Sequence, residues 1–261
     1  MLGILKSDDK RYDELIKLID KPFIYSDCFS DFINIDTLLI PVMGIDERYY
    51  IKGTNINIKD IISHNDINKI ICGVKSDKLI NLCKNLDIEL ISFMSNSTYI
   101  WANAKLTAEG MLKKIFSDLN DSISDEGILI LGYGYCGKAL FDYLKPICKN
   151  ITIYAHDYHD IKELFCRDIN ISKLDDLNKY TIIINTVANN IITKEKIDNI
   201  NIDTKVYDIS SYPFGFDIDY AHQIGLKINI IPKIPSLYFN KTAAKLIYNE
   251  IKEIIWFVNK C

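Results

Sequence analysis

The sequence is poor in arginine and histidine, which restricts the chemistry that it can perform. Of its 261 residues, only three are arginines and four are histidines. A 2-hydroxy-acid dehydrogenase needs an imidazole beside a carboxylate in its cleft, whereas His222 lies in a segment typical of an outer helix. We therefore expect His222 at the surface, and the sequence identifies no catalytic residue.

Long apolar runs and cysteine pairs are also missing. No apolar run approaches the roughly 20 residues that span a bilayer, and the N-terminus lacks the features of a secretion signal. We therefore expect a cytoplasmic protein without membrane contact. The seven cysteines are odd in number and never form a C-x-x-C pair, which argues against disulfides and zinc. His156 and His159, with the carboxylates beside them, lack ligands from a third region, so we expect no metal.

Charge and composition are ordinary for a globular protein. The formal net charge is −4 and the positive residues are scattered, so we expect no nucleic acid partner. Hydrophobic residues make up 48% of the chain and charged residues 25%, which is enough apolar material for two modest cores.

Short apolar runs alternate with amphipathic stretches in both halves, which is typical of strands and helices in a parallel sheet. Each run is continuous, as in a strand covered on both faces. The expected strands are 3–5, 38–42, 69–72, 89–93, 128–131, 151–154, 181–184, 206–209 and 227–231. The expected helices are 10–19, 77–86, 103–119, one that ends at Pro146, and 241–258.

This pattern predicts an α/β protein of two doubly wound, Rossmann-like domains with a cleft between them. The first domain covers residues 1–103, and a connecting helix follows at 104–120. The second domain covers residues 121–235. A C-terminal helix at 236–261 helps to join the two.

A glycine motif lies between an expected strand and an expected helix. Gly132, Gly134 and Gly137 follow the G-x-G-x-x-G pattern, in which the glycines permit a tight turn, approach of a pyrophosphate and close helix packing. The helix N-terminus would then face the phosphates. The alternative is that the glycines merely form a compact connection. We interpret residues 121–235 as an NAD(P)-binding domain, with Tyr135 and Cys136 inside the phosphate turn.

The adenosine side of this site is open to three interpretations. Asp157 lies about 20 residues after Gly137, which suits the ribose of NAD, while His156 could meet the 2′-phosphate of NADP. A solvated strand end is the third alternative. We add Thr186 to the candidate cofactor contacts.

Several segments together resemble the A subunit of bacterial dipicolinate synthase. They are 103–110, 132–137, 208–217, 232–236 and 241–243, and their order and spacing match over most of the chain. The resemblance implies an oxidoreductase of sporulating bacteria. It would oxidise a dihydrodipicolinate-type intermediate of lysine biosynthesis to dipicolinic acid with NADP, together with a flavoprotein-like B subunit.

The sequence resembles a divergent member of this family. His156 stands where the family has an NADP-type arginine. At seven other positions the family usually has a glycine, a cation or a proline. The residues of this chain at those positions are Asp8, Leu106, Tyr212, Phe214, Lys233, Ser236 and Ala244.

A dicarboxylate substrate requires cationic or backbone donors. With so few arginines, Arg11 and Lys241 are the leading candidates, and we add Thr242 and Asn103. Arg11 is expected at the carboxyl edge of the first sheet and Lys241 at that of the second, so that both converge on the cleft. Each could instead be a solvated residue at a helix end. No dedicated histidine is needed, because forming an aromatic ring is strongly downhill and chiefly requires an aligned cofactor.

Two other functions remain open. One is another two-domain NAD(P)-dependent dehydrogenase that acts on a shikimate-like or amino-acid substrate. The other is a dinucleotide-binding scaffold subunit that performs no chemistry.

Overall fold

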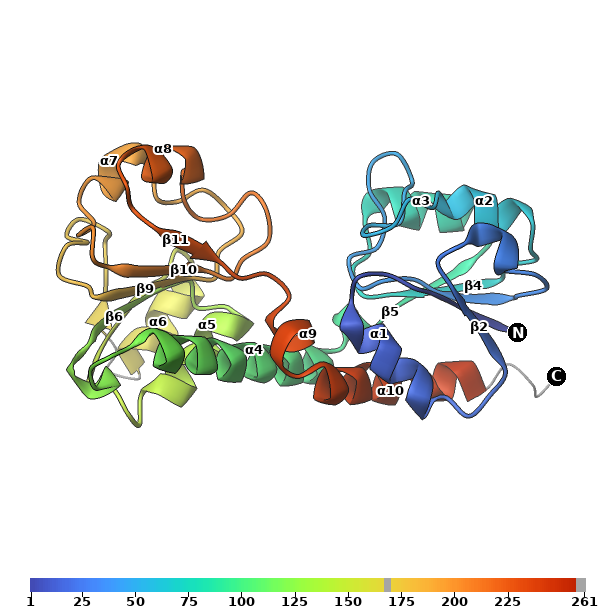
Figure 1. Cartoon of the computed structure of the whole chain (residues 1–261), viewed down its shortest axis with the longest axis horizontal. Coiled ribbons are helices and arrows are strands. Elements are labelled where there is room, and N and C mark those ends of the chain that lie inside the picture. The colour runs from blue at the N-terminus through green and yellow to red at the C-terminus, as the bar shows by residue number, and fades with distance from the viewer. Residues whose placement is uncertain (167–169, 257–261) are drawn as a thin grey trace. The chain divides into compact units, whose positions relative to one another are not determined.

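The computed structural model describes residues 1–166 and 170–256, which form two compact units. The first unit combines Met1–Asn103 with the C-terminal segment that begins at Ser236, and the second is Ala104–Pro235. Two helices cross these boundaries in sequence, α4 (Ser97–Asp118) and α9 (Ile234–Tyr238). The final helix is α10, described over Asn240–Trp256 (Figure 1). Residues 257 and 258 of the expected helix lie outside the described residues.

A five-stranded parallel sheet forms the centre of the first unit, with the strand order β2-β1-β3-β4-β5. The chain winds from β1 to one side and then to the other, which is the doubly wound arrangement. Besides α10, its elements are β1 (Leu2–Leu5), α1 (Lys10–Leu15), η1 (Ile16–Leu18), β2 (Phe23–Ser26), η2 (Phe29–Asp31), β3 (Thr37–Leu39), α2 (Ile58–Ser63), β4 (Lys69–Cys72), α3 (Asp77–Asn85), β5 (Glu89–Ser92) and η3 (Phe93–Ser95).

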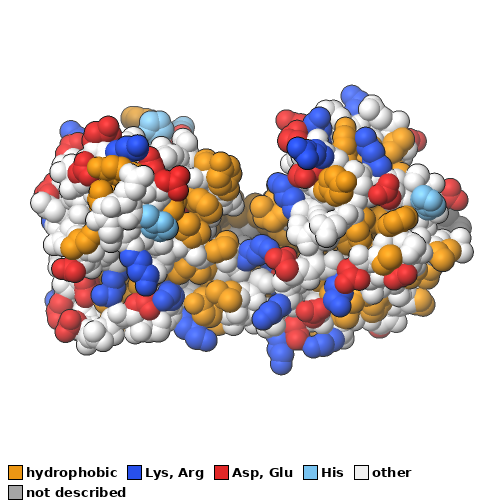
Figure 2. Space-filling view, turned by 45° about the horizontal axis from the view of Figure 1, so that its top comes forward, with side chains coloured by type: hydrophobic (Ala, Val, Ile, Leu, Met, Phe, Trp, Pro, Cys, Tyr) orange, Lys and Arg blue, Asp and Glu red, His pale blue; other side chains and the backbone are white. Residues whose placement is uncertain are grey.

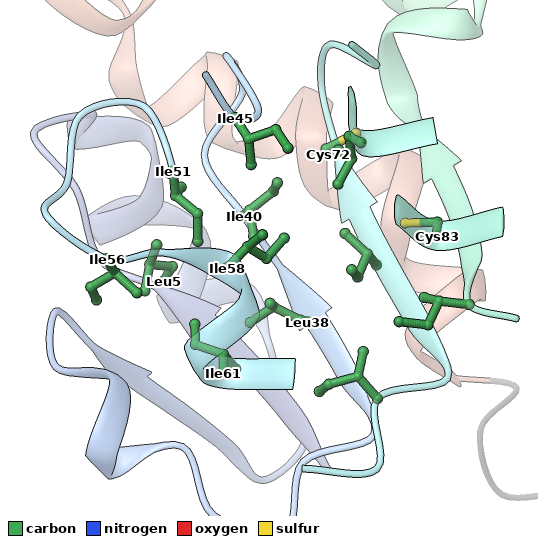
Figure 3. Packing of buried hydrophobic residues seen from close by; sticks show 14 of the residues in the cluster. Leu5, Leu38, Ile40, Ile45, Ile51, Ile56, Ile58, Ile61, Cys72 and Cys83 are labelled. Carbon is green, nitrogen blue, oxygen red and sulfur yellow. The ribbon is translucent and has the colours of Figure 1, made fainter. Parts of the chain in front are cut away.

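Both faces of this sheet are buried, because successive side chains of a strand point to opposite sides. Leu5 and Leu38 belong to a cluster with residues of α2 and α3, including Ile58, Ile61 and Cys83 (Figure 3). The neighbouring residues on the same strands, such as Ile4 and Leu39, point to the other face and belong to a second cluster with α1 and α10. The continuous apolar runs in the sequence follow from this two-sided burial.

A six-stranded parallel sheet forms the centre of the second unit, with the order β11-β10-β9-β6-β7-β8. Counted within the unit, this is the Rossmann order 3-2-1-4-5-6 read from the other edge. Its elements are η4 (Ile123–Asp125), β6 (Gly127–Leu131), α5 (Tyr135–Leu144), β7 (Asn150–Tyr154), α6 (Tyr158–Cys166), β8 (Asn170–Ile171), β9 (Ile182–Asn185), α7 (Lys194–Ile197), β10 (Lys205–Asp208), α8 (Ile218–Gln223) and β11 (Ile228–Ile230).

The expected fold class, two doubly wound Rossmann-like units, is confirmed. Several elements were not expected, among them β2, α2 and α6. The side chains of β2 are all half-buried, and its short apolar run Phe23-Ile24-Tyr25 was not among the expected strands. The strand expected at 38–42 ends at Leu39. Pro41 has no N–H group with which to continue the pairing.

Charges of both signs are interspersed on the face of the molecule in Figure 2, where Lys and Arg side chains lie among Asp and Glu. The negative net charge is therefore not gathered into one patch on that face. Within residues 1–166 and 170–256, every helix is too short or too polar to cross a membrane.

A buried ion pair fixes the start of α1 in the first unit. The Asp9 carboxylate accepts hydrogen bonds from the Arg11 backbone N–H (3.1 Å) and from the guanidinium Nε (2.9 Å) and Nη2 (2.5 Å). Ser236, the first residue of the C-terminal segment, donates to the same carboxylate at 2.8 Å. The side chains of Asp9 and Arg11 are only 6% and 7% exposed. The pair therefore holds α1 and the returning chain together.

Protonation of Asp9 would break this arrangement. Burial works to raise the pKa of Asp9, but its hydrogen bonds and attraction to Arg11 prevail and lower that pKa. Because the pKa of Asp9 is lower in the folded protein, its ionised carboxylate stabilises the fold fully at pH values above its ordinary pKa, near 4. This stabilisation is lost as the pH falls through the lower pKa of the folded state.

We predict that Arg11→Ala lowers the free energy of unfolding at pH 7 by about 3–5 kcal/mol, because Asp9 remains buried without its cation. Urea denaturation measures this change, with the exposed arginine in Arg48→Ala as the control. The difference between wild type and Arg11→Ala should shrink below about pH 4. Equal stabilities of Arg11→Ala and Arg48→Ala at pH 7 would contradict the structural role of the pair.

Candidate dinucleotide-binding site

The second sheet has its topological switch point between β6 and β9. From β6 the chain continues to β7 and β8 on one side and then crosses to β9 on the other. Open α/β sheets bind ligands at the carboxyl ends of the two strands at such a point. Gly132 follows β6 there, and Thr186 follows β9.

The three glycines of the motif meet three different steric requirements. Gly132 has a φ of +99°, and a Cβ there would lie 2.5 Å from Thr186 Oγ1. A Cβ on Gly137 would lie 2.1 Å from the Gly132 carbonyl oxygen. A Cβ on Gly134 would meet no protein atom within 4 Å. Gly132 and Gly137 are thus required by the fold, whereas Gly134 borders open space.

Gly134 is the N-cap of α5, and its carbonyl oxygen accepts the first helical hydrogen bond from Lys138 N at 2.8 Å. The first amides of a helix have no intrahelical acceptor and carry partial positive charge, so they bind anions. The space beside Gly134 therefore fits a phosphate group. The arrangement is compatible with a dinucleotide pyrophosphate, whose approach would require a glycine at this position of ordinary φ.

Other candidate cofactor residues surround this turn. Thr186 binds the end of β6 twice, since its N–H and its hydroxyl both donate to the Leu131 carbonyl, at 2.9 and 2.8 Å. Tyr135 is 40% exposed in the first turn of α5. Burial raises the pKa of the Cys136 thiol, although a hydrogen bond with Thr107 opposes the shift. Cys136 is therefore a neutral thiol near pH 7 and not an activated nucleophile.

The connecting helix α4 supports α5 through the 103–110 segment of the sequence resemblance. Glu109 accepts a hydrogen bond from the Tyr143 hydroxyl of α5 at 2.8 Å, and Thr107 contacts Cys136 as described. These contacts fix the helix whose N-terminus faces the phosphate space.

His156 and Asp157 follow β7 and are both exposed. Asp157 Oδ1 accepts a hydrogen bond from the N–H of His159 at 2.7 Å, which caps the start of α6. The carboxylate thus has a structural role whether or not it also binds a ribose.

A buried polar network at the carboxyl ends of β9 and β10 was missed by sequence reasoning. Asp208 is fully buried and accepts four hydrogen bonds, from Ser210 N (2.9 Å), Ser210 Oγ (2.7 Å), Gly215 N (2.7 Å) and Asn185 Nδ2 (3.0 Å). The Asn185 amide also bonds both backbone groups of Val187 at 3.0 Å. The signals were a polar residue at the end of each apolar strand, Asn185 and Asp208, and the place of Asp208 at the start of the resembling segment 208–217.

The substrate candidates all lie in α1, α4 or α10. Arg11 is engaged with Asp9, and Asn103 is half-buried in α4. Lys241 and Thr242 are exposed in the first turn of α10. α10 packs in the core of the first unit through residues after Lys241, and the expected place of Lys241 at the edge of the second sheet stays a prediction.

A cavity of about 360 Å³ lies at the carboxyl edge of the first sheet. It is lined by Lys6, Ser7, Asp8, Asp27, Gly53, Thr54 and Asn55. Among the described residues, no group of three His, Cys, Asp or Glu side chains could hold a metal ion. The cysteines 28, 72, 83, 136, 148 and 166 are free thiols.

No family model matches the sequence. The chain is 19% identical over 234 residues to the A subunit of dipicolinate synthase from Bacillus subtilis (strain 168), a match that covers 86% of this chain and 79% of that protein. The structure of the dipicolinate synthase A subunit from Bacillus halodurans superposes with a TM-score of 0.79 at 18% identity, over 97% of both chains. The apo-structure of D-lactate dehydrogenase from Escherichia coli gives 0.67 at 10% identity, over 97% and 95%.

These similarities confirm the resemblance predicted from the sequence segments. The solved structures share the two-unit fold of this chain. In sequence and in fold, the chain is a divergent relative of the dipicolinate synthase A subunit.

Proposed function

We propose that the chain binds NADP and oxidises a dihydrodipicolinate-type intermediate to dipicolinic acid, as the A subunit of a dipicolinate synthase. The observation that carries the proposal is the open space beside Gly134, at the N-terminus of α5 and at the switch point of the second sheet. The sequence similarity supports the choice of reaction. NAD is the alternative cofactor.

When bound, the cofactor would supply a two-electron acceptor for the hydride of a dihydropyridine ring, and the ring would become aromatic on also releasing a proton to solvent. The chain's own task is to hold the reactants in line. The proposed cofactor contacts are Gly132, Gly134, Tyr135, Cys136, Gly137, His156, Asp157 and Thr186.

The substrate carboxylates need donors that are accessible. Lys241 and Thr242 are exposed, and the N-terminus of α10 adds partial positive charge. We propose these two residues as carboxylate contacts and include Asn103 as a third candidate. Arg11 stays a candidate, although two of its three guanidinium nitrogens already donate to Asp9.

The remaining parts of the proposal rest on the resemblance alone. They are a flavoprotein-like B subunit as partner, a role in sporulation and a cytoplasmic location. Copurification of the chain with a flavoprotein-like partner from sporulating cells would support them.

A second candidate function is a dehydrogenase that acts on an amino-acid substrate. The cavity at the edge of the first sheet combines one lysine with two carboxylates, Asp8 and Asp27. This charge set suits a zwitterion with one carboxylate and one ammonium group better than a dianion. Turnover of amino acids, but not of the dihydropyridine dicarboxylate, would favour this function. A scaffold would turn over neither.

We predict that Gly134→Val abolishes binding of NADP and NAD while the fold keeps its stability. The new side chain meets no protein atom near its Cβ but fills the phosphate space. Gly137→Ala is the contrasting variant, because its Cβ would meet the Gly132 carbonyl oxygen, which should cost about 3 kcal/mol of stability. Isothermal titration calorimetry and thermal denaturation measure the two effects. Undiminished cofactor binding by Gly134→Val would overturn the site.

The cofactor preference depends on Asp157. A carboxylate repels a 2′-phosphate, so Asp157→Ser should tighten NADP binding and loosen NAD binding, by about tenfold in the ratio of their dissociation constants. Serine also caps helices, so α6 should remain stable. Titration of both cofactors checks this result. An unchanged ratio would show that Asp157 serves only as a helix cap.

For Lys241→Ala we predict a fall in kcat/KM for the dicarboxylate of about 30-fold, equivalent to about 2 kcal/mol of lost binding. The control is Lys245→Ala, since Lys245 is exposed one turn later on α10. Steady-state kinetics of both variants decide the matter. A change below about threefold in Lys241→Ala would mean that Lys241 is a surface charge.

A further inference from the structure

The loop that follows β10 exposes an aromatic side chain on an unusually well fixed backbone. In this loop, residues 209–215, which we call the Tyr212 loop, Tyr212 is 84% exposed. Its ring lies edge-on to that of Phe214, with centroids 5.9 Å apart and an interplanar angle of 86°. An exposed tyrosine on a freely moving loop needs no explanation, but here the loop is anchored at both ends.

The anchor is the carboxylate of Asp208. One oxygen accepts from the N–H and the hydroxyl of Ser210 at the start of the loop, and the other from the N–H of Gly215 at its end. Gly215 packs directly on Asn185, since a Cβ there would lie 2.3 Å from Nδ2. Two acceptor oxygens that each face N–H donors require a carboxylate, because an amide would point its own N–H at a donor.

The same network reaches the glycine turn. Asn185 holds Val187, whose Cγ2 would lie 2.7 Å from a Cβ on Gly132. The carboxyl ends of β6, β9 and β10 are therefore joined through Gly132, Val187, Asn185 and Asp208. In this strand order a dinucleotide crosses the switch point, so that its second mononucleotide lies over the β9–β10–β11 half of the sheet.

We propose that the Tyr212 loop is the wall of the nicotinamide half of the site. Tyr212 packs against the nicotinamide ring, and Asp208 is the positioning residue that holds the loop in place. This inference rests on the proposed dinucleotide binding and deepens it. Offset or edge-on contacts between aromatic rings add a modest, geometry-dependent stabilisation, which a fixed loop preserves and a mobile one loses.

The test compares a whole dinucleotide with its adenosine half. Calorimetry would measure the affinity of NADP+ and of 2′-phospho-ADP-ribose, which lacks the nicotinamide. Tyr212→Ala should weaken NADP+ binding by roughly three- to tenfold and leave 2′-phospho-ADP-ribose within about twofold. Tyr158→Ala is the matched control, because Tyr158 is 75% exposed after β7, on the adenosine half of the sheet. It should show no loss selective for the dinucleotide.

Two further variants test the anchor. Asp208→Asn should give the same selective loss, or a larger one, with circular dichroism confirming that it folds. Ser210→Ala removes only the hydroxyl donor to Asp208, and we expect it to give a smaller loss of NADP+ affinity relative to 2′-phospho-ADP-ribose. This variant tests the anchor if Asp208→Asn does not fold.

The outcomes separate this inference from the proposed function. Binding of NADP+ by the wild type, with Tyr212→Ala unchanged or equally weakened for both ligands, would overturn the role of the Tyr212 loop alone. Failure of the wild type to bind either ligand would overturn the dinucleotide site itself, and this inference with it.

Discussion

The candidate site depends on how closely the first turn of α5 approaches the end of β6. The Cα of Gly137 lies so near the Gly132 carbonyl that no side chain fits between them. This contact directs the N-terminus of α5 toward the carboxyl edge of the sheet at the switch point. The open space beside Gly134 follows from the same geometry. Thr186 and Val187 close the other side of the turn, so its shape is determined by the packing of two neighbouring strands.

The polar network around Asp208 extends this order beyond the glycine turn. A fully buried carboxylate is costly unless its hydrogen bonds are complete, and Asp208 accepts four. Three of these come from the loop that it holds, and the fourth from Asn185. The first unit contains a comparable device, in which Asp9 joins α1 to Ser236. In each unit, a carboxylate near the end of a strand fixes segments that the sheet alone would leave loose.

Local patterns in the sequence were sufficient for the fold class and for the glycine turn. The central strands are continuous apolar runs because both faces are covered, and the G-x-G-x-x-G spacing has a steric meaning that depends on few neighbours. Arg11 could not be assigned in this way, because the Asp9 carboxylate that binds it is also held by Ser236, more than 200 positions away. The environment of Lys241 likewise depends on distant residues, because Ile247 and Ile251 of its helix pack in the core of the first unit. Edge strand β2 was not expected, although Phe23, Ile24 and Tyr25 are consecutive apolar residues.

The central claim is that the carboxyl edge of β6 holds a dinucleotide, and a crystal structure of the chain grown with millimolar NADP+ tests it most directly. The account predicts a pyrophosphate within hydrogen-bonding distance of the backbone amides at residues 134–136, with the adenosine over β7 and the nicotinamide over β9 and β10. A cofactor bound elsewhere on the chain, or crystals that contain none despite saturating NADP+ and NAD+, would contradict it.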